Sequence, residues 1–146
     1  MEKTQRRQTV SAAQTTERTS ILLIDDEAAF GRLVKLNLEQ YGLYAVDLSH
    51  DGEDGLEKIR KGRYDLVILD LLMPRMEGHE VLRRIQEFSR IPVIIISAYI
   101  PPQVEQEIRR RGAAACLSKP VSPDAMILAI HRALSSALPQ EPRASS

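Results

Sequence analysis

The chain has 146 residues, which is the length of one ordinary domain. Its 20 basic and 20 acidic side chains give a formal net charge of zero, and aromatic residues make up 4% of the chain, with no tryptophan. This composition argues against a protein that captures nucleic acid or an anionic membrane by its charge, or that stacks single-stranded bases on aromatic rings.

Two terminal segments differ in composition from the rest of the chain. Residues 1–20 are rich in Thr, Gln, Ser and Arg, and residues 139–146 contain two prolines and no aliphatic side chain larger than alanine. Neither segment can bury enough apolar surface to offset the entropy lost on ordering. We therefore expect a disordered tail at residues 1–20, a domain at residues 21–138, and a disordered tail or linker at residues 139–146.

Five short apolar runs divide the expected domain. They predict strands at residues 21–24, 44–48, 66–69, 93–96 and 114–118, of which 44–48 gives the weaker signal. The run at residues 21–24 shows no alternation of polar and apolar residues, which predicts a strand buried on both faces. Each run is followed by apolar residues at helical spacing, and Ser122, Pro123 and Asp124 are typical of a helix start. Alternating strands and helices predict an α/β three-layer sandwich, with helices on both faces of a parallel sheet.

Polar side chains follow four of these runs where each expected strand ends. Asp25 and Asp26 follow the first run, Asp70 the third, Ser97 the fourth and Lys119 the fifth. The carboxyl ends of parallel strands meet at one edge of the sheet, so we expect these side chains to converge. Clustered carboxylates repel one another unless a cation joins them, and oxygen ligands suit Mg²⁺. The pattern therefore predicts magnesium-dependent phosphoryl transfer onto an aspartate.

Four stretches also carry a family resemblance: ILLIDDE beginning at Ile21, LVILDLLMPRMEG ending at Gly78, IIISA ending at Ala98, and LSKP ending at Pro120. In this order they resemble the receiver domain of bacterial two-component response regulators. The resemblance implies a flavodoxin-like five-stranded sheet of order 2-1-3-4-5 and a phosphorylation switch that is not a classical enzyme, although it assists its own phosphorylation. It also implies a sensor histidine kinase or histidine phosphotransfer protein as phosphodonor. A downstream output protein or domain would read the surface of the fourth helix, fifth strand and fifth helix.

The resemblance assigns the acceptor and the metal ligands residue by residue. Asp70 matches the phospho-acceptor. Asp26, Asp70 and the backbone carbonyl of Leu72 match the direct Mg²⁺ ligands, and Asp25 matches the ligand that acts through water. Leu72 and Tyr99 match positions that border the phosphoryl group, and their apolar bulk leads us to expect a long-lived phosphoaspartate.

Of the remaining site residues, Lys119 and Ser97 match the family pattern and Cys116 departs from it. Lys119 matches the lysine that pairs with the phosphoryl group, in a Lys-Pro bond that is usually cis in the family, and Ser97 matches the switch hydroxyl. Cys116 stands where the family often has Tyr or Phe, whose ring moves inward with that hydroxyl. We expect Ser97 and its loop to move without this coupling, or with Tyr99 as the aromatic. A single cysteine also fits a reducing cytoplasm.

Three further possibilities follow from the sequence. The chain is compatible with a receiver cut from a longer regulator whose output domain lies outside these residues. A haloacid-dehalogenase-like phosphatase also uses Mg²⁺ and an aspartate nucleophile, but it needs an Asp-x-Asp pair after the first strand, where this chain has adjacent Asp25 and Asp26. An outward-facing Leu128 on the last helix would suit a homodimer through the fourth helix, fifth strand and fifth helix.

Overall fold

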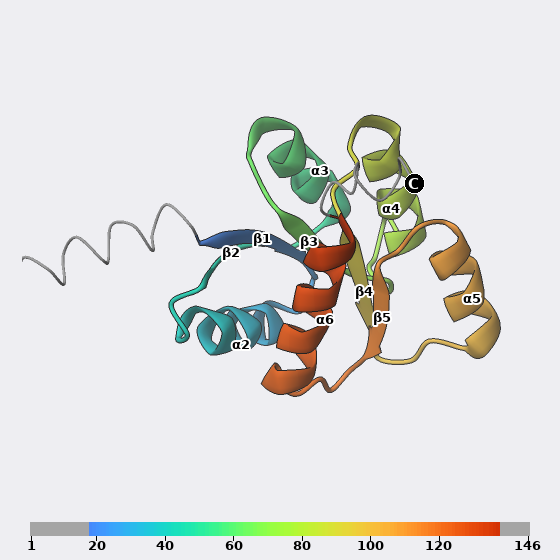
Figure 1. Cartoon of the computed structure of the whole chain (residues 1–146). Coiled ribbons are helices and arrows are strands. Elements are labelled where there is room, and N and C mark those ends of the chain that lie inside the picture. The colour runs from blue at the N-terminus through green and yellow to red at the C-terminus, as the bar shows by residue number, and fades with distance from the viewer. Residues whose placement is uncertain (1–17, 138–146) are drawn as a thin grey trace, which may run out of the picture.

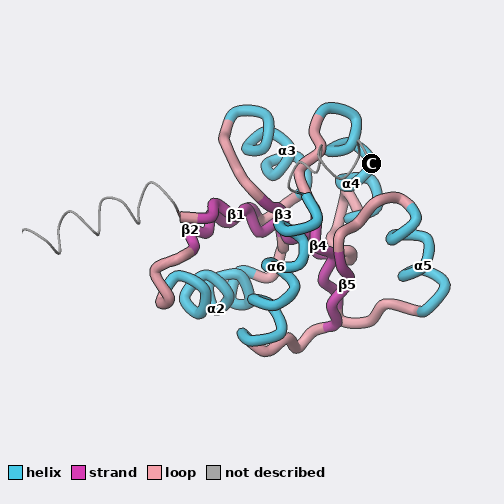
Figure 2. The backbone as a smooth tube through the Cα atoms, in the orientation of Figure 1, coloured by secondary structure: helices cyan, strands magenta, loops and turns pink. Residues whose placement is uncertain are grey.

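The computed structural model describes residues 18–137, in which strands and helices alternate (Figures 1 and 2). The strands are β1 (Thr19–Ile24), β2 (Tyr44–Ser49), β3 (Leu66–Asp70), β4 (Val93–Ser97) and β5 (Ala115–Ser118). The helices are α2 (Ala28–Glu39), α3 (Gly52–Lys61), α4 (Gly78–Phe88), α5 (Pro102–Arg110) and α6 (Pro123–Ala137). Within the described residues, no helix is long and apolar enough to cross a membrane.

The start of the domain differs from the sequence prediction. Thr19 and Ser20 belong to β1, so the expected tail over residues 1–20 extends two residues too far. The backbone N–H of Thr19 donates to the carbonyl of Leu43, and that of Ser20 donates to the Asp65 carboxylate, so both residues are tied to the domain. The expected tails at residues 1–17 and 139–146 lie outside the described residues.

The five strands form one parallel sheet in the order β2-β1-β3-β4-β5, which confirms the predicted topology. β1 pairs with strands on both sides, so that Ile21 lies opposite Val46 of β2 and Leu66 of β3. The strand order reverses beside β1, where the chain turns to one side for β2 and to the other for β3. In open α/β sheets, ligands bind beyond the carboxyl ends of the strands at such a reversal.

Helices cover both faces of the sheet and form the outer layers of the sandwich (Figure 1). Leu22 and Ile24 of β1 pack in the core beneath α3, α4 and α5. Ile21 and Leu23 of the same strand pack in the core beneath α2 and α6. Successive strand side chains point to opposite faces, and both faces are covered. This explains why the apolar runs of β1, β3 and β4 show no alternation.

α4 begins against the end of β3, and Gly78 allows this close approach. A Cβ atom on Gly78 would lie 2.5 Å from the Asp70 carbonyl oxygen and 2.7 Å from Leu71 Cα. Both of these atoms are backbone atoms and cannot swing aside. The absence of a side chain at Gly78 therefore fixes how closely α4 packs behind Asp70.

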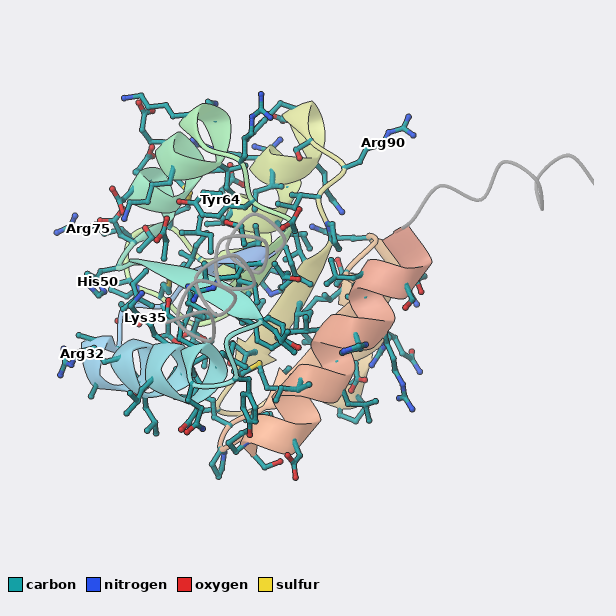
Figure 3. The ribbon with its side chains drawn as sticks, turned by 60° about the vertical axis from the view of Figure 1, so that its left-hand side comes forward. Arg32, Lys35, His50, Tyr64, Arg75 and Arg90 are labelled. Carbon is teal, nitrogen blue, oxygen red and sulfur yellow. The ribbon has the colours of Figure 1, made fainter. Side chains whose placement is uncertain are left out.

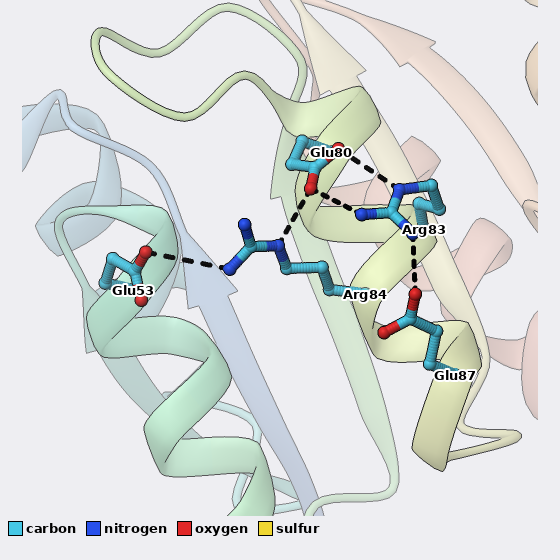
Figure 4. Close-up of polar contacts among 5 residues, drawn as sticks. All are labelled: Glu53, Glu80, Arg83, Arg84 and Glu87. Carbon is cyan, nitrogen blue, oxygen red and sulfur yellow. Dashed lines mark hydrogen bonds and ion pairs between the residues drawn. The ribbon is translucent and has the colours of Figure 1, made fainter.

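An ion-pair network joins α3 to α4 on the outer surface (Figure 4). Arg84 pairs with Glu80 of its own helix at 2.8 Å and reaches Glu53 of α3 at 3.8 Å. Arg83 pairs with Glu80 at 2.7 Å and with Glu87 at 2.6 Å. Hydrogen bonds from Arg83 and Arg84 lower the pKa of Glu80 to about 2. The carboxylate therefore stays ionised at neutral pH, where it can hold both arginines.

Side chains also reach the outer strand β2; Lys35 and Tyr64 are labelled in Figure 3. Lys35 of α2 donates to the carbonyl of Val46 and pairs with Glu39, whose carboxylate accepts the Val46 N–H at 2.9 Å. The Tyr64 hydroxyl donates to Asp47 at 2.7 Å. Burial of the ring and the Asp47 carboxylate raise the pKa of Tyr64 to about 12.

Candidate functional site

The carboxyl ends of β1, β3, β4 and β5 bring the predicted site residues to one edge of the sheet. Asp25, Asp70 and Ser97 are buried there, with 2%, 3% and 0% of their surface exposed. The edge opens into a cavity of about 270 Å³. Its lining residues are Asp26, Glu27, Asp70, Leu72, Ala98 and Lys119. The predicted convergence is therefore seen in the structure.

Three carboxylates form the acidic centre of this edge. Asp25, Asp26 and Asp70 each offer an oxygen, and these atoms lie within 4.8 Å of one another. Loop amides orient two of the three, because the Glu27 N–H donates to Asp25 at 2.8 Å and the Leu72 N–H donates to Asp70 at 3.1 Å. Hard oxygen donors at this spacing, beside an open cavity, fit Mg²⁺, which keeps several water ligands and accepts phosphate oxygens.

The Asp70 carboxyl is unusually hard to ionise. Burial and the nearby Asp25 carboxylate raise the pKa of Asp70 to about 6, despite the Leu72 N–H and the charge of Lys119, which act in the opposite direction. Such a shift means that the negative charge on Asp70 lacks full compensation in the folded chain. A cation bound beside Asp70 would reduce this penalty.

Lys119 brings a positive charge to the acidic centre. Its Nζ atom lies 2.9 Å from Asp25 Oδ2 and 3.6 Å from Asp70 Oδ2, and it donates to Glu27 Oε1. It also lies 4.4 Å from the centroid of the Phe30 ring. Burial disfavours the charged ammonium, but Glu27, Asp25 and Asp70 outweigh burial and raise the pKa of Lys119. The peptide bond between Lys119 and Pro120 is cis, as the resemblance implied.

Sequence reasoning gave no role to Glu27 or Phe30, although both contact Lys119. Glu27 directly follows the aspartate pair, and Phe30 lies one helical turn further along α2. A carboxylate next to the Asp pair was the only available signal. The contact between Glu27 and Lys119 joins residues 92 positions apart, and no local sequence pattern specifies such a contact.

The other predicted residues take different positions around the site. The Ser97 hydroxyl is fully buried and has no hydrogen-bond partner among residues 18–137, as suits a group that can bond to something new. Leu72 is 58% exposed and lines the cavity, whereas Tyr99 is 67% exposed and does not line it. Cys116 is half-buried in β5 against the core beneath α3, α4 and α5, and burial raises the pKa of its thiol. The roles expected for these four residues remain predictions.

Fold and site together define a class of protein: a doubly wound α/β domain with a buried aspartate, a lysine and an acidic cluster where its strand order reverses. A comparison with protein families narrows this class. Residues 21–131 match the model of the response regulator receiver domain. The chain belongs to the response regulator receiver domain family, which is a family of signalling domains.

Curated relatives agree with this family. The chain is 42% identical over 80 residues to the response regulator ArlR of Staphylococcus saprophyticus, a match that covers 55% of this chain and 36% of that protein. It is 35% identical over 115 residues to the transcriptional regulatory protein ResD of Bacillus subtilis, covering 79% of this chain and 48% of ResD. The chain therefore spans less than half the length of either relative.

Solved structures show the same fold over most of the described residues. The chemotaxis protein CheY4 of Vibrio cholerae superposes with a TM-score of 0.73 at 29% identity, covering 80% of this chain and 99% of that structure. A CheY-like receiver domain protein from Methanospirillum hungatei gives a TM-score of 0.75 at 28% identity, covering 82% and 95%. The flavodoxin-like class predicted from the sequence is confirmed.

Proposed function

We propose that this receiver domain of a two-component response regulator is switched by phosphorylation of Asp70. The phosphodonor is a phosphohistidine on a sensor histidine kinase or a histidine phosphotransfer protein. The observation that carries the proposal is the buried Asp70 carboxylate at the cavity, with Lys119 Nζ 3.6 Å away and two further aspartates beside it. A cytoplasmic location follows from such a donor.

The transfer requires one bond to form and one to break. An Asp70 carboxylate oxygen attacks the phosphorus atom, the phosphorus–nitrogen bond breaks, and its electron pair stays on the imidazole nitrogen of the donor. Mg²⁺, held by Asp26, Asp70 and the Leu72 carbonyl and through water by Asp25, would neutralise charge on the phosphoryl oxygens. Lys119 supplies a second positive charge from the carboxyl end of β5, at the same edge of the sheet. In this sense the domain assists its own phosphorylation.

A change at Asp70 is relayed through Ser97 in this proposal. The phosphoryl oxygens would offer the buried Ser97 hydroxyl the partner that it lacks among the described residues. Movement of Ser97 would carry the loop between β4 and α5 with it, without an aromatic ring at Cys116. A phosphoryl-analogue complex in which Ser97 keeps its place would contradict this relay.

The altered surface comprises α5, β5 and α6, which a downstream output protein or domain would read. Leu128 of α6 is 50% exposed, and we retain homodimerisation through this surface as a prediction. The partial coverage of ArlR and ResD favours the alternative that the chain is a receiver portion of a longer regulator. The complete genomic reading frame tests that alternative. The family match lends no support to the haloacid-dehalogenase-like alternative.

Intact mass measurement tests the assignment of Asp70. The chain is incubated with Mg²⁺ and a small acyl phosphate, and we expect one phosphoryl group on the wild type and none on Asp70→Asn. Asp124→Asn, which removes a carboxylate from the first turn of α6, is the matched control and should label like the wild type. Equal labelling of wild type and Asp70→Asn would end the assignment.

A further inference from the structure

Lys119 makes a closer contact with Glu27 than with the proposed phospho-acceptor. Its ammonium donates to Glu27 Oε1 and lies 2.9 Å from Asp25 Oδ2, but it remains 3.6 Å from Asp70 Oδ2. The Lys119 ammonium also lies over the Phe30 ring, 4.4 Å from Nζ to the ring centroid, where a cation is attracted by the ring face. Two residues of the β1–α2 region, outside the acidic centre, therefore help to place Lys119.

The local structure of the β1–α2 turn directs Glu27 toward the cavity. The Glu27 N–H donates to Asp25 Oδ1, which fixes the backbone of the residue that precedes α2. The Glu27 side chain makes no capping hydrogen bond to its own helix, and it lines the cavity. Its carboxylate is thus available to Lys119, which arrives from the end of β5.

A phosphoryl group on Asp70 changes which partners Lys119 can keep. The Lys119 ammonium donates to Glu27 and lies 2.9 Å from Asp25 Oδ2, so a phosphoryl oxygen that draws it toward Asp70 acts against both contacts. The Asp25 side chain is 1% exposed, so Asp25 would be left as a buried, uncompensated charge if Lys119 moved away from it. The Glu27 side chain is 61% exposed and is readily rehydrated. Exchange of Glu27 for a phosphoryl oxygen is therefore the less costly rearrangement.

We propose that Glu27 is a positioning residue that holds Lys119 in the unphosphorylated chain and competes with the phosphoryl group for its ammonium. This inference rests on the proposed function at Asp70. Glu27 thereby opposes entry into the phosphorylated conformation, and it is released when that conformation forms. Glu27 immediately precedes α2, so its release leaves a carboxylate at the start of that helix that no longer pairs with Lys119.

Beryllofluoride, an analogue of the phosphoryl group, tests the competition by calorimetric titration in the presence of Mg²⁺. An ion pair with one exposed partner contributes little, so we expect Glu27→Gln to lower the dissociation constant by about twofold to fivefold. Glu57→Gln is the matched control, since Glu57 is similarly exposed and pairs only with Lys61 of α3 among the described residues. The control should bind like the wild type.

The position of Lys119 is measured separately by NMR of the lysine-labelled chain. The Phe30 ring current should shift the Lys119 ε-methylene protons upfield in the wild type, and beryllofluoride should reduce that shift. Glu27→Gln should reduce it without beryllofluoride, because the ammonium loses one of its anchors. Glu27→Asp keeps the charge but shortens the side chain by one methylene, so it should resemble Glu27→Gln in both measurements.

Each outcome separates the inference from the proposed function. A wild type that fails to bind beryllofluoride would overturn the proposed function itself. Binding that is equal in the wild type and Glu27→Gln would overturn the competition and leave Asp70 phosphorylation intact. Tighter binding with an unmoved Lys119 signal, or with Glu27→Asp behaving like the wild type, would show simple charge repulsion and refute positioning. A moved signal with unchanged affinity would also refute the competition.

Discussion

The raised pKa of Asp70 predicts that the proposed phospho-acceptor destabilises its own fold. The pKa is about 6 in the folded chain, against an ordinary value of 3.8. Between pH 4 and pH 6 Asp70 therefore binds more protons in the folded state than in the unfolded state, so its contribution to the free energy of unfolding falls as the pH rises. A shift of about two units corresponds to about 3 kcal/mol. Asp70→Asn cannot ionise, so it should escape this loss.

Urea unfolding with a metal chelator measures the effect. We expect Asp70→Asn to be more stable than the wild type by about 3 kcal/mol at pH 8, and the difference to shrink toward zero near pH 4. Mg²⁺ should narrow the gap at pH 8, because the proposed metal site exists only in the folded chain and its occupation would stabilise the wild type. A difference that is absent at pH 8, or that does not change with pH, would refute the account of uncompensated charge at the site.

Two other substitutions test neighbouring features. Leu72 borders the cavity with an apolar side chain, so Leu72→Asn should admit water and shorten the lifetime of the phosphorylated form. Loss of the phosphoryl group is followed by intact mass. A wild type that loses it as fast as Leu72→Asn would contradict this prediction. Gly78→Ala should lower the free energy of unfolding by about 3 kcal/mol in urea titrations, since its Cβ meets backbone atoms behind Asp70. Gly42→Ala, with a φ of 73° and no atom within 4 Å, should cost only about 1 kcal/mol for its backbone conformation.

Burial on both faces made the strands readable from the sequence. The runs that end at Asp25 and Asp70 are apolar throughout, because each strand packs under helices on both sides. Their shared sheet edge then followed from parallel topology alone. The start of β1 was missed because Thr19 and Ser20 are polar and resemble the preceding tail. They join the sheet through backbone hydrogen bonds, which composition does not encode.

Helical spacing also predicted α2 without showing which of its side chains face inward. Val34 and Leu38 lie four residues apart on the buried face, while Leu33 and Leu36 are 55% and 68% exposed. The apolar side chains of α2 are spread over more of the helix circumference than the sheet can cover. Some of them therefore remain exposed to solvent. The contact between Glu27 and Lys119 was missed for a different reason, since it depends on the reach of two side chains that lie 92 positions apart in the sequence.

The contacts of Lys35 and Glu39 with β2 have a consequence for assembly. β2 is an outer strand, and such strands offer free backbone groups to strands of other chains. At Val46 the carbonyl already accepts from Lys35 and the N–H already donates to Glu39. A foreign strand would have to displace both charged side chains before it could extend the sheet. The free edge of β2 is therefore protected against pairing with a strand of another chain. Any association between copies of this domain would then use the helical faces.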